Sequence, residues 1–399
     1  MALKAESRER LLKRLETIRD VSKRRALINR EGLDGDEAKA LLDEAHFRTR
    51  GREKFPRAKD MRFTREGLAQ ASSKAVAEYR TWKMRQQLGA INRVLDVGAG
   101  IGGDTIALAL RWGVVAVEKD PGTVELLRHN LDVYGVADNV EIVGADIRQW
   151  LQTDQAQGYR ADISCVFFDP SRRASGRRVV SGEEYEPPLE LIEELRQFCP
   201  DMGVKISPLT ELSDISYDCD IEVISHKGTV RDMVLWFGRC KLAPDTRAVM
   251  ATKLPERVTL VQRPGPRPKV GAPLQYLYEP DPAFTKAHLV DVLATAHGLQ
   301  LLDRDLGYLT GAKRLDEPVF KRYEICQLAP FDYGEISRRL VALNMGQIDF
   351  KARGVGIDLR VLHQRIKGRG KRRGVVVLTR VAGRKQALIC RYDGATWDK

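Results

Sequence analysis

The sequence lacks the groupings of cysteine and histidine that bind structural metals or form disulfide frameworks. Its six cysteines are scattered over 399 residues, with no CxxC pair and no histidine at ligand spacing. We therefore expect no metal site, no disulfide framework and a reducing, cytoplasmic setting.

Long apolar runs are absent as well. The first twenty residues, MALKAESRERLLKRLETIRD, contain no uninterrupted apolar segment of the signal-peptide kind. No run elsewhere approaches the roughly 18 apolar residues that a membrane span needs. The sequence predicts a soluble protein without a membrane partner, and its length allows two or three domains, each with its own core.

Charge is distributed unevenly along the chain. The net charge is +12, made up of +9 over residues 1–90, −10 over 91–240 and +13 over 241–399. The densest basic run, RIKGRGKRR (365–373), contains the candidate RNA-binding residues Arg369, Lys371, Arg372 and Arg373. Basic flanks around an acidic middle suit a protein that neutralises phosphates. A solvated basic surface without a partner is the alternative.

Residues 1–90 are predicted to form a helical N-terminal region. Apolar residues recur at spacings of three and four in a segment that starts near Thr64, which is typical of one stripe of a long helix. The stripe consists of Leu68, Ala71, Ala75, Tyr79 and Trp82. We expect it to be packing surface rather than a ligand site.

From residue 91 the pattern changes to short apolar runs that alternate with helical segments. Helices fit between the first five of the seven runs that we interpret as strands. These runs are 93–98, 114–118, 140–146, 163–169, 202–207, 220–225 and 234–238. The order predicts a Rossmann-like α/β domain over residues 91–245, with a parallel sheet and an antiparallel edge.

The rest of the chain is predicted to hold a linker and a smaller domain. Residues 246–273 include VQRPGPRPKVGAP (261–273), which is rich in proline and glycine and favours a linker. Residues 274–399 alternate strands and helices as in a small α+β domain. Within it, Asp281, Pro282 and Gly298 frame a helix at about 282–297.

The segment LDVGAGIGGDT (95–105) follows the first predicted strand and opens a helix. Its backbone can pass close to a ligand because of Gly98, Gly100 and Gly102, with Ala99 among them. A glycine-rich turn in this position is a candidate cofactor-binding loop.

Carboxylates end three successive strands of the predicted sheet. Asp96 could accept from an amino group or a bridging water, Glu118 from a ribose diol and Asp146 from an adenine amine. Because the carboxyl ends of parallel strands meet at one edge, these acids suit a nucleoside that carries a cation. A dinucleotide of the NAD type is the alternative ligand.

These residues resemble the cofactor site of class I S-adenosylmethionine-dependent methyltransferases, with Asp96-Val-Gly98-Ala-Gly100 as the first motif. The resemblance implies S-adenosylmethionine as the cofactor. The segment HNLDVYGVADNVEIVGADI (129–147) is similar to trimethylguanosine synthase and related RNA guanine methyltransferases. That likeness implies methylation of an exocyclic guanine amine.

The stretch FFDPSRR (167–173) occupies the place where amino methyltransferases carry Asp or Asn, two prolines and an aromatic ring. Asp169 and the Pro170 carbonyl can accept hydrogen bonds from an amine and align its nitrogen for in-line transfer. Ser171 and Arg172 replace the second proline and the ring. We predict that Arg172 and Arg173 stack on a base or hold a phosphate.

Two points beside this motif stay open. The arginines could instead pair with Glu183, Glu184 or Glu186 and brace the loop. Lys205 and Ser207 end the fifth strand at the same edge of the sheet, where a place in the cleft and a packing role are equally compatible with the sequence.

Several segments together resemble a bacterial and archaeal group of methyltransferases with a C-terminal THUMP-like domain. These segments are residues 54–80, DPSRR (169–173), EEYEPPLELI (183–192), GVKISP (203–208), YLYEPDP (276–282) and GYLTG (307–311). By likeness to true THUMP modules, the C-terminal domain implies a structured RNA partner, tRNA or rRNA.

The function predicted from these features is methylation of a base nitrogen in such an RNA, with S-adenosylmethionine as the methyl donor. Two alternatives remain. One is a methyltransferase for a protein side chain or a small molecule, and the other is a non-catalytic RNA-binding protein that retains the cofactor fold.

Overall fold

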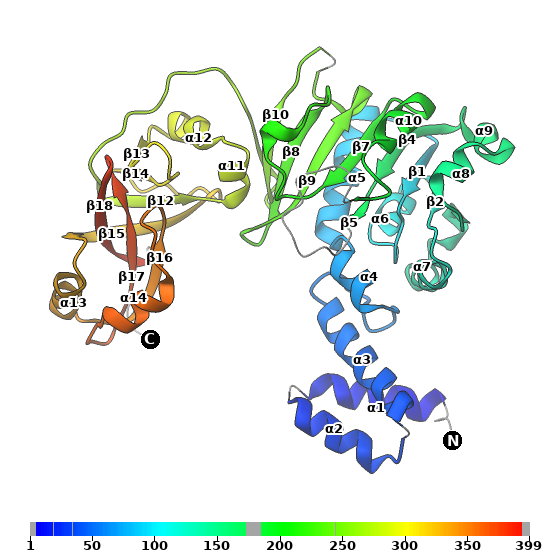
Figure 1. Ribbon diagram of the computed structural model, residues 1–399, viewed down its shortest axis with the longest axis horizontal. Coiled ribbons are helices and arrows are strands. Elements are labelled where there is room, and N and C mark those ends of the chain that lie inside the picture. The colour runs from blue at the N-terminus through cyan, green and yellow to red at the C-terminus, as the bar shows by residue number, and fades with distance from the viewer. Residues whose placement is uncertain (1–4, 19, 34, 173–184, 244, 393–399) are drawn as a thin grey trace. The chain divides into compact units, whose positions relative to one another are not determined.

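The computed structural model describes residues 5–18, 20–33, 35–172, 185–243 and 245–392. Two compact units make up the chain (Figure 1). The first runs from the N-terminus to Ile221 and includes Arg231–Ala248, and the second comprises Glu222–Val230 and the residues from Val249 onward. Arg173, a predicted substrate contact, and Glu183 and Glu184, its alternative ion-pair partners, lie outside the described residues.

Helices come first in the chain, as predicted. They are α1 (Ala5–Thr17), α2 (Val21–Arg30), α3 (Gly35–Gly51), α4 (Arg65–Gln70) and α5 (Lys74–Leu88). The first three enclose a small apolar core that includes Leu12, Ile28 and Leu41 (Figure 1).

The prediction of one long helix from Thr64 is wrong, because the chain leaves the helical conformation between α4 and α5. Ala71, which follows α4, has an extended backbone. Lys54 Nζ donates to the carbonyls of Leu68, Ala69 and Ala71 at 2.7–2.9 Å. The break therefore lets a lysine satisfy carbonyl groups that the end of α4 leaves without helical partners.

A mostly parallel sheet forms the centre of the first unit. The sheet has nine strands in the described residues, and six of them are β1 (Arg93–Val97), β2 (Gly113–Val117), β3 (Val140–Val143), β4 (Ile163–Phe168), β7 (Met202–Ile206) and β9 (Thr229–Phe237). They lie in the order β3-β2-β1-β4-β7-β9. Neighbours from β3 to β7 are parallel and β9 is antiparallel to β7. The α/β class, the parallel sheet and the antiparallel edge are thereby confirmed.

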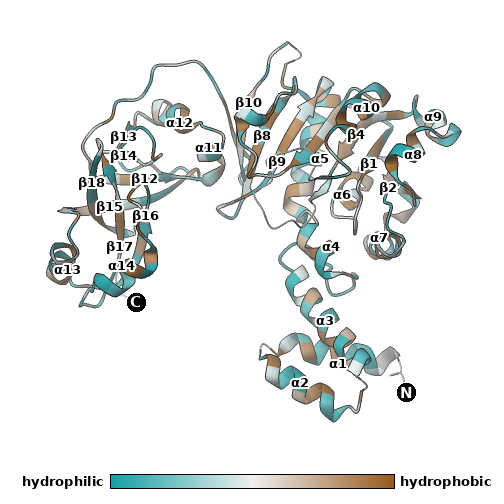
Figure 2. Cartoon of the chain, viewed as in Figure 1, coloured by the Kyte–Doolittle hydropathy of each residue, from teal (hydrophilic) through white to brown (hydrophobic). Residues whose placement is uncertain are grey.

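Helices connect the parallel strands, and the strands themselves are largely apolar (Figure 2). The connecting helices are α6 (Thr105–Ala109), α7 (Pro121–Tyr134), α8 (Ile147–Leu151), α9 (Asp154–Tyr159) and α10 (Leu191–Phe198). Val94, Leu95 and Val97 of β1 are almost completely buried. Such continuous burial is typical of a parallel sheet covered on both faces.

The second unit contains a separate sheet of seven strands. Its elements are β12 (Tyr276–Pro280), α11 (Pro282–Lys286), α12 (Val290–His297), β13 (Gln300–Leu301), β14 (Leu309–Gly311), β15 (Phe320–Pro330), α13 (Tyr333–Ala342), β16 (Met345–Ala352), α14 (Leu359–Arg365), β17 (Arg372–Val381) and β18 (Arg384–Tyr392). The strand order is β13-β14-β12-β15-β18-β17-β16. The α+β character predicted for this part of the chain is therefore confirmed.

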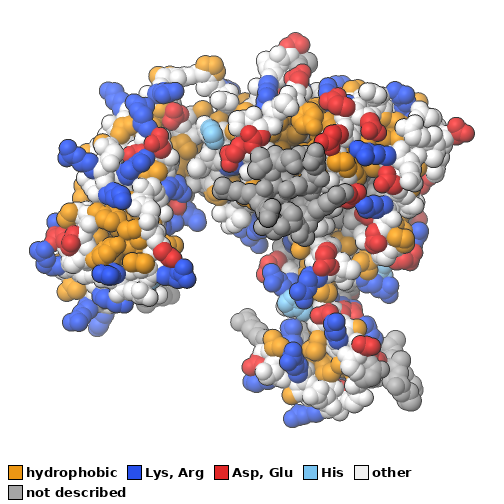
Figure 3. All heavy atoms as spheres, in the orientation of Figure 1, with side chains coloured by type: hydrophobic (Ala, Val, Ile, Leu, Met, Phe, Trp, Pro, Cys, Tyr) orange, Lys and Arg blue, Asp and Glu red, His pale blue; other side chains and the backbone are white. Residues whose placement is uncertain are grey.

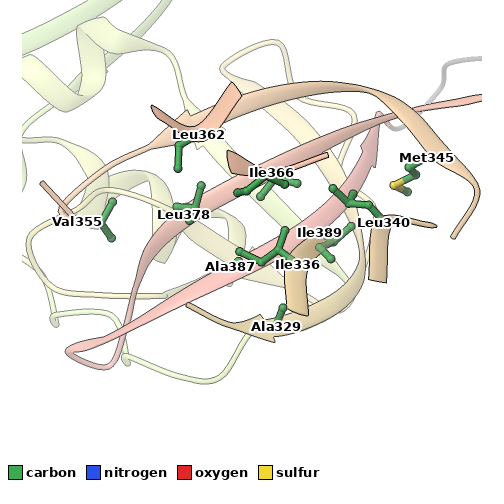
Figure 4. Close-up of a cluster of buried hydrophobic side chains, with 11 residues drawn as sticks. Ala329, Ile336, Leu340, Met345, Val355, Leu362, Ile366, Leu378, Ala387 and Ile389 are labelled. Atoms are coloured by element: carbon green, nitrogen blue, oxygen red, sulfur yellow. The ribbon is translucent and has the colours of Figure 1, made fainter. Parts of the chain in front are cut away.

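Helices α13 and α14 bury apolar side chains against this sheet (Figure 4). Ile336 and Leu340 from α13 and Leu362 from α14 meet Leu378 and Ile389 of the central strands, and all five are fully buried. The hairpin β17–β18 turns at Ala382-Gly383, where both residues have positive φ. This core holds the segment that carries the basic run.

Two local features of the second unit differ from the sequence prediction. The helix predicted over 282–297 is divided into α11 and α12 around His288, which has φ 58°. Its predicted ends are nevertheless correct, because Asp281 caps α11 and Gly298 ends α12 in the left-handed conformation. The predicted linker 246–273 contains an antiparallel pair, β10 (Val249–Leu254) and β11 (Val258–Val261). No helix in the described residues combines the length and apolarity needed to cross a membrane.

A buried guanidinium attaches α5 to the sheet of the first unit. Arg80 is 1 % exposed, and it forms ion pairs with Asp104, which follows the glycine-rich turn, and with Asp232 of β9. It also donates to Ser72 at 2.5 Å, and it lies 5.1 Å from the ring centroid of Phe167 in β4. Burial alone would lower the pKa of Arg80, but the two carboxylates outweigh it and raise the pKa.

Replacing this cation is expected to destabilise the first unit strongly. Arg80→Met leaves Asp104 and Asp232 buried without a counter-charge, so the free energy of unfolding should fall by about 3–5 kcal/mol. Urea denaturation measures the change. Gln86→Ala, at an exposed position of the same helix, is the control and should change the free energy of unfolding by less than about 0.5 kcal/mol. A loss below about 1 kcal/mol in Arg80→Met would mean that the two ion pairs of Arg80 do not stabilise the first unit.

Candidate active site

The glycine-rich turn between β1 and α6 has backbone conformations that glycine adopts more readily than other residues. Gly98, Gly100 and Gly102 have φ of 80°, 55° and 97°, a region that favours glycine. A Cβ placed on Gly98 would lie 2.6 Å from the backbone carbonyl oxygen of Asp169. The backbones of the predicted cofactor loop and the predicted catalytic corner are therefore in direct contact, and only glycine permits that contact.

Asp96 lies at the base of this turn, fully buried. Its Oδ2 accepts from Thr105 Oγ1 at 2.6 Å, whereas its Oδ1 has no hydrogen-bond partner among the described residues. Burial, reinforced by the nearby charge of Asp104, raises the pKa of Asp96 to about 8. An unpaired buried carboxylate oxygen beside a glycine cradle fits a ligand that supplies a positively charged donor.

Glu118 and Asp146 lie at the same edge of the sheet, and the fold already uses both carboxylates. Glu118 accepts from the backbone amides of Gly100 and Asp120, each at 3.0 Å, so it braces the turn. Asp146 caps α8 by accepting from the Arg148 amide at 2.9 Å. Each carboxylate retains further lone pairs for the hydroxyl and amine groups of a nucleoside. Ala99 is buried in the turn, where its amide donates to Val117 of β2 at 3.2 Å.

The Asp169-Pro170 corner follows β4 directly. Asp169 is held through its backbone amide, which donates to the Val97 carbonyl at 3.0 Å, and Pro170 is buried. Burial raises the pKa of Asp169, and the cation of Lys205 opposes this shift. The Lys205 Nζ lies 2.7 Å from Asp169 Oδ2.

Ser171 and Arg172 form a short strand, β5 (Ser171–Arg172), directly after this corner. β5 pairs with β6 (Tyr185–Glu186) in an antiparallel register. Ser171 Oγ donates to the Glu186 carbonyl at 3.1 Å. Tyr185 is buried, and its hydroxyl accepts from the Ser207 amide at 2.8 Å. Ser207 thus anchors the hairpin that carries Arg172.

The carboxylate of Glu186 has a partner outside this hairpin. It forms an ion pair with Lys119 at 2.8 Å, next to Glu118 of the cofactor edge. That contact joins the candidate cofactor and substrate segments. Among the described residues, no group of three or more His, Cys, Asp or Glu is placed to hold a metal.

The helical region supplies residues to the site that the sequence pattern did not reveal. Asn130 of α7 is buried and bonds both the amide and the carbonyl of Arg62, at 2.9 and 3.1 Å. A Cβ on Gly67 would meet the Ile101 side chain at 2.6 Å, and one on Gly103 would meet the Ser72 amide at 2.9 Å. The segment around α4 therefore packs directly against the glycine-rich turn.

The basic run of the second unit extends from the last residue of α14 to the first two residues of β17. Arg369, Lys371, Arg372 and Arg373 are all exposed, and Figure 3 shows many Lys and Arg side chains on the visible face of this domain. A Cβ on Gly370 would lie 2.2 Å from the Asn344 backbone, so close packing fixes the loop. Arg373 also pairs with Asp349 at 3.2 Å. The four cations are therefore exposed on the surface, and one of them, Arg373, also forms an ion pair with Asp349.

The strand order, glycine turn and strand-end acids define the class I methyltransferase fold. Residues 91–175 match the family described as RNA cap guanine-N2 methyltransferase, and residues 320–392 match the THUMP domain-like family. The two matches cover the β1–β5 part of the first unit and the β15–β18 part of the second.

Individual proteins agree with these family matches. An uncharacterized S-adenosylmethionine-dependent methyltransferase of Mycobacterium tuberculosis is 29% identical over 337 residues, which cover 83% of this chain and 87% of that protein. Trimethylguanosine synthase of Schizosaccharomyces pombe is 30% identical over 129 residues, 31% of this chain and 49% of that protein. The crystal structure of a putative methyltransferase from Porphyromonas gingivalis has a TM-score of 0.75 at 19% identity and covers 98% of this chain and all of that chain. The predicted resemblance to class I methyltransferases with a THUMP-like domain is confirmed.

The buried carboxyl of Asp96 should make cofactor binding depend on pH. With its pKa raised to about 8, the carboxyl is largely protonated at pH 6 and ionised at pH 9, and a cationic ligand favours the ionised form. Calorimetry with S-adenosylmethionine should therefore show affinity that rises up to tenfold per pH unit below about pH 8 and then levels off.

Asp96→Asn is the matched control, because only the titration of the cofactor's own amino group remains in that variant. Its affinity should be lower than that of the wild type at pH 9, and it should depend less on pH. Equal pH dependence in the two proteins would exclude Asp96 from the site.

Proposed function

We propose that this protein is an S-adenosylmethionine-dependent methyltransferase that acts on a base nitrogen of a structured RNA, tRNA or rRNA. The observation that carries the proposal is the backbone contact between Gly98 and Asp169. This contact supports the proposal because the glycine-rich turn lies directly beside the Asp169-Pro170 corner. The match of residues 91–175 to RNA cap guanine-N2 methyltransferases supports RNA as the substrate.

Asp96, Glu118, Asp146 and the turn Gly98–Gly102 would hold the cofactor. S-adenosylmethionine supplies an electrophilic methyl group when bound. The unpaired Asp96 oxygen fits a cofactor that carries a positively charged amino group.

Asp169 and the Pro170 carbonyl would accept hydrogen bonds from the amine of the substrate. Holding the nitrogen in line lowers the barrier without a strong base. In the proposal Arg172 and Arg173 grip the base or a phosphate, and the basic run of the second unit holds the RNA backbone.

Methyl transfer to RNA tests the whole proposal. The full chain is incubated with methyl-labelled S-adenosylmethionine and total RNA from a strain that lacks the gene, and labelled nucleosides are identified by mass spectrometry. RNA from the parent strain, already modified, should accept little label. Cofactor binding without RNA labelling, together with label in protein or small molecules, would favour the alternative substrates.

Arg172→Ala should keep cofactor affinity and lower the transfer rate at least tenfold, because the base or phosphate loses a bidentate or stacking partner. Arg111→Ala, an exposed arginine between α6 and β2, is the control and should leave both quantities unchanged. Wild-type turnover in Arg172→Ala would remove Arg172 from the substrate site.

Neutralising Arg369, Lys371, Arg372 and Arg373 to Gln should weaken RNA binding and flatten its salt dependence. Each lost phosphate contact should reduce the log–log slope by up to about one unit. Filter binding at several salt concentrations measures the slope. Arg304, Lys313 and Lys321, exposed in the same unit, are changed to Gln as the control. Equal binding by the two variants would mean that the basic run is a solvated surface.

A further inference from the structure

Lys205 contacts the carboxylate at the centre of the candidate site. It projects from β7, the strand next to β4, and its Nζ lies 2.7 Å from Asp169 Oδ2. The side chains of Lys205 and Asp169 are 17 % and 21 % exposed. Both therefore lie in the wall of the site, close to the space that a substrate would enter, and neither is sealed in the core.

The pair is connected to the buried guanidinium beneath it. Lys205 Nζ lies 3.4 Å from Ser72 Oγ, which accepts from Arg80 at 2.5 Å. Arg80 in turn binds Asp104 and Asp232. One continuous polar network thus links α5, the glycine-rich turn, β7 and β9 to Asp169.

The charges around Asp169 come from every element packed against it. Lys205 on β7 and Arg80 on α5 supply positive charge, whereas Asp104 and Asp96 supply carboxylates on the side of the glycine turn. Asp232 acts on Lys205 from β9. Without Lys205, Asp169 would be a partly buried carboxylate among other carboxylates, an environment that favours protonation.

Protonation would weaken Asp169 in the function proposed for it. The neutral acid carries an O–H donor on one oxygen and leaves a single uncharged acceptor for the substrate amine, whereas the carboxylate offers stronger acceptors on both oxygens. Lys205 also binds one of the two oxygens, so Oδ1 is the atom left for a substrate. The lysine therefore decides both the charge of this carboxyl group and which of its atoms is available.

We infer that Lys205 is a positioning residue for methyl transfer. It keeps Asp169 ionised near neutral pH and directs one oxygen toward the N–H of the substrate. This inference rests on the proposed function of Asp169. It assigns to the end of β7 a role in orienting the nucleophile that the glycine motif and the Asp-Pro motif do not include.

The first test measures the titration of Asp169 itself. Carboxyl carbon NMR of protein labelled at aspartate, with Asp169→Asn to assign the signal, gives the pKa in wild type, Lys205→Met and Lys205→Arg. The pKa should rise by more than one unit in Lys205→Met and stay close to wild type in Lys205→Arg, which keeps the charge. An unshifted pKa in Lys205→Met would overturn the inference.

The second test follows methyl transfer to the same RNA as a function of pH. Lys205→Met should lose at least tenfold in turnover at pH 7, recover at higher pH and keep its affinity for S-adenosylmethionine. Lys241→Met removes a different buried lysine, which pairs with Asp218 at 2.9 Å, and should keep the wild-type profile. A wild-type profile in Lys205→Met would contradict the inference.

A double variant that removes the charges of both Lys205 and Asp169 provides a test even if Lys205→Met does not fold. Asn at position 169 offers an amide oxygen that needs no counter-cation, so Asp169→Asn combined with Lys205→Met should be more active at pH 7 than Lys205→Met and should lack the pH shift. If Lys205→Met yields no folded protein, the double variant tests the inference by itself. Its turnover should not rise with pH, because position 169 then has no carboxyl group to ionise. A rise of the kind that carboxyl ionisation causes would overturn the inference. Absence of cofactor binding or RNA methylation in the wild type would instead mean that the proposed function has failed.

Discussion

The site depends on the neutralisation of buried charge by Arg80. Its guanidinium binds carboxylates that arrive from the glycine turn and from β9, and it lies against the ring of Phe167 in β4. Arg80 supplies the counter-charge that two carboxylates buried with it need. Segments far apart in the sequence are therefore held in one arrangement by electrostatics, and the Asp169–Lys205 pair is attached to it through Ser72.

Most of the fold of the first unit could be predicted because its signals are local. Runs such as RVLDV carry apolar residues on both faces, which indicates buried parallel strands, and positive φ at Gly98 favours glycine. The break between α4 and α5 could not be predicted. The carbonyls at the end of α4 are satisfied there by Lys54, a residue 14–17 positions away whose contact exists only in the folded chain.

The candidate site was predictable where strand ends carry acids and was missed where helices complete it. Asp96, Glu118 and Asp146 follow from the geometry of parallel strands. Arg80 gave no such signal, because a charged residue on a helix is almost always exposed and nothing in its neighbours marks it as buried. Lys205 was compatible with a place in the cleft, but only its distance to Asp169 separates that role from packing.

The contacts of the segment around α4 with the glycine-rich turn determine where the chain can be shortened without removing partners of the turn. A chain that began at Ile91 would keep every strand of the first sheet and the whole segment matched by the cap methyltransferase family. It would lack the groups that Asn130, Gly103 and Asp104 meet upstream. The segment that matches the methyltransferase family is therefore smaller than the unit that folds. Recombination that exchanges the helices must also exchange the residues of the glycine-rich turn that contact them.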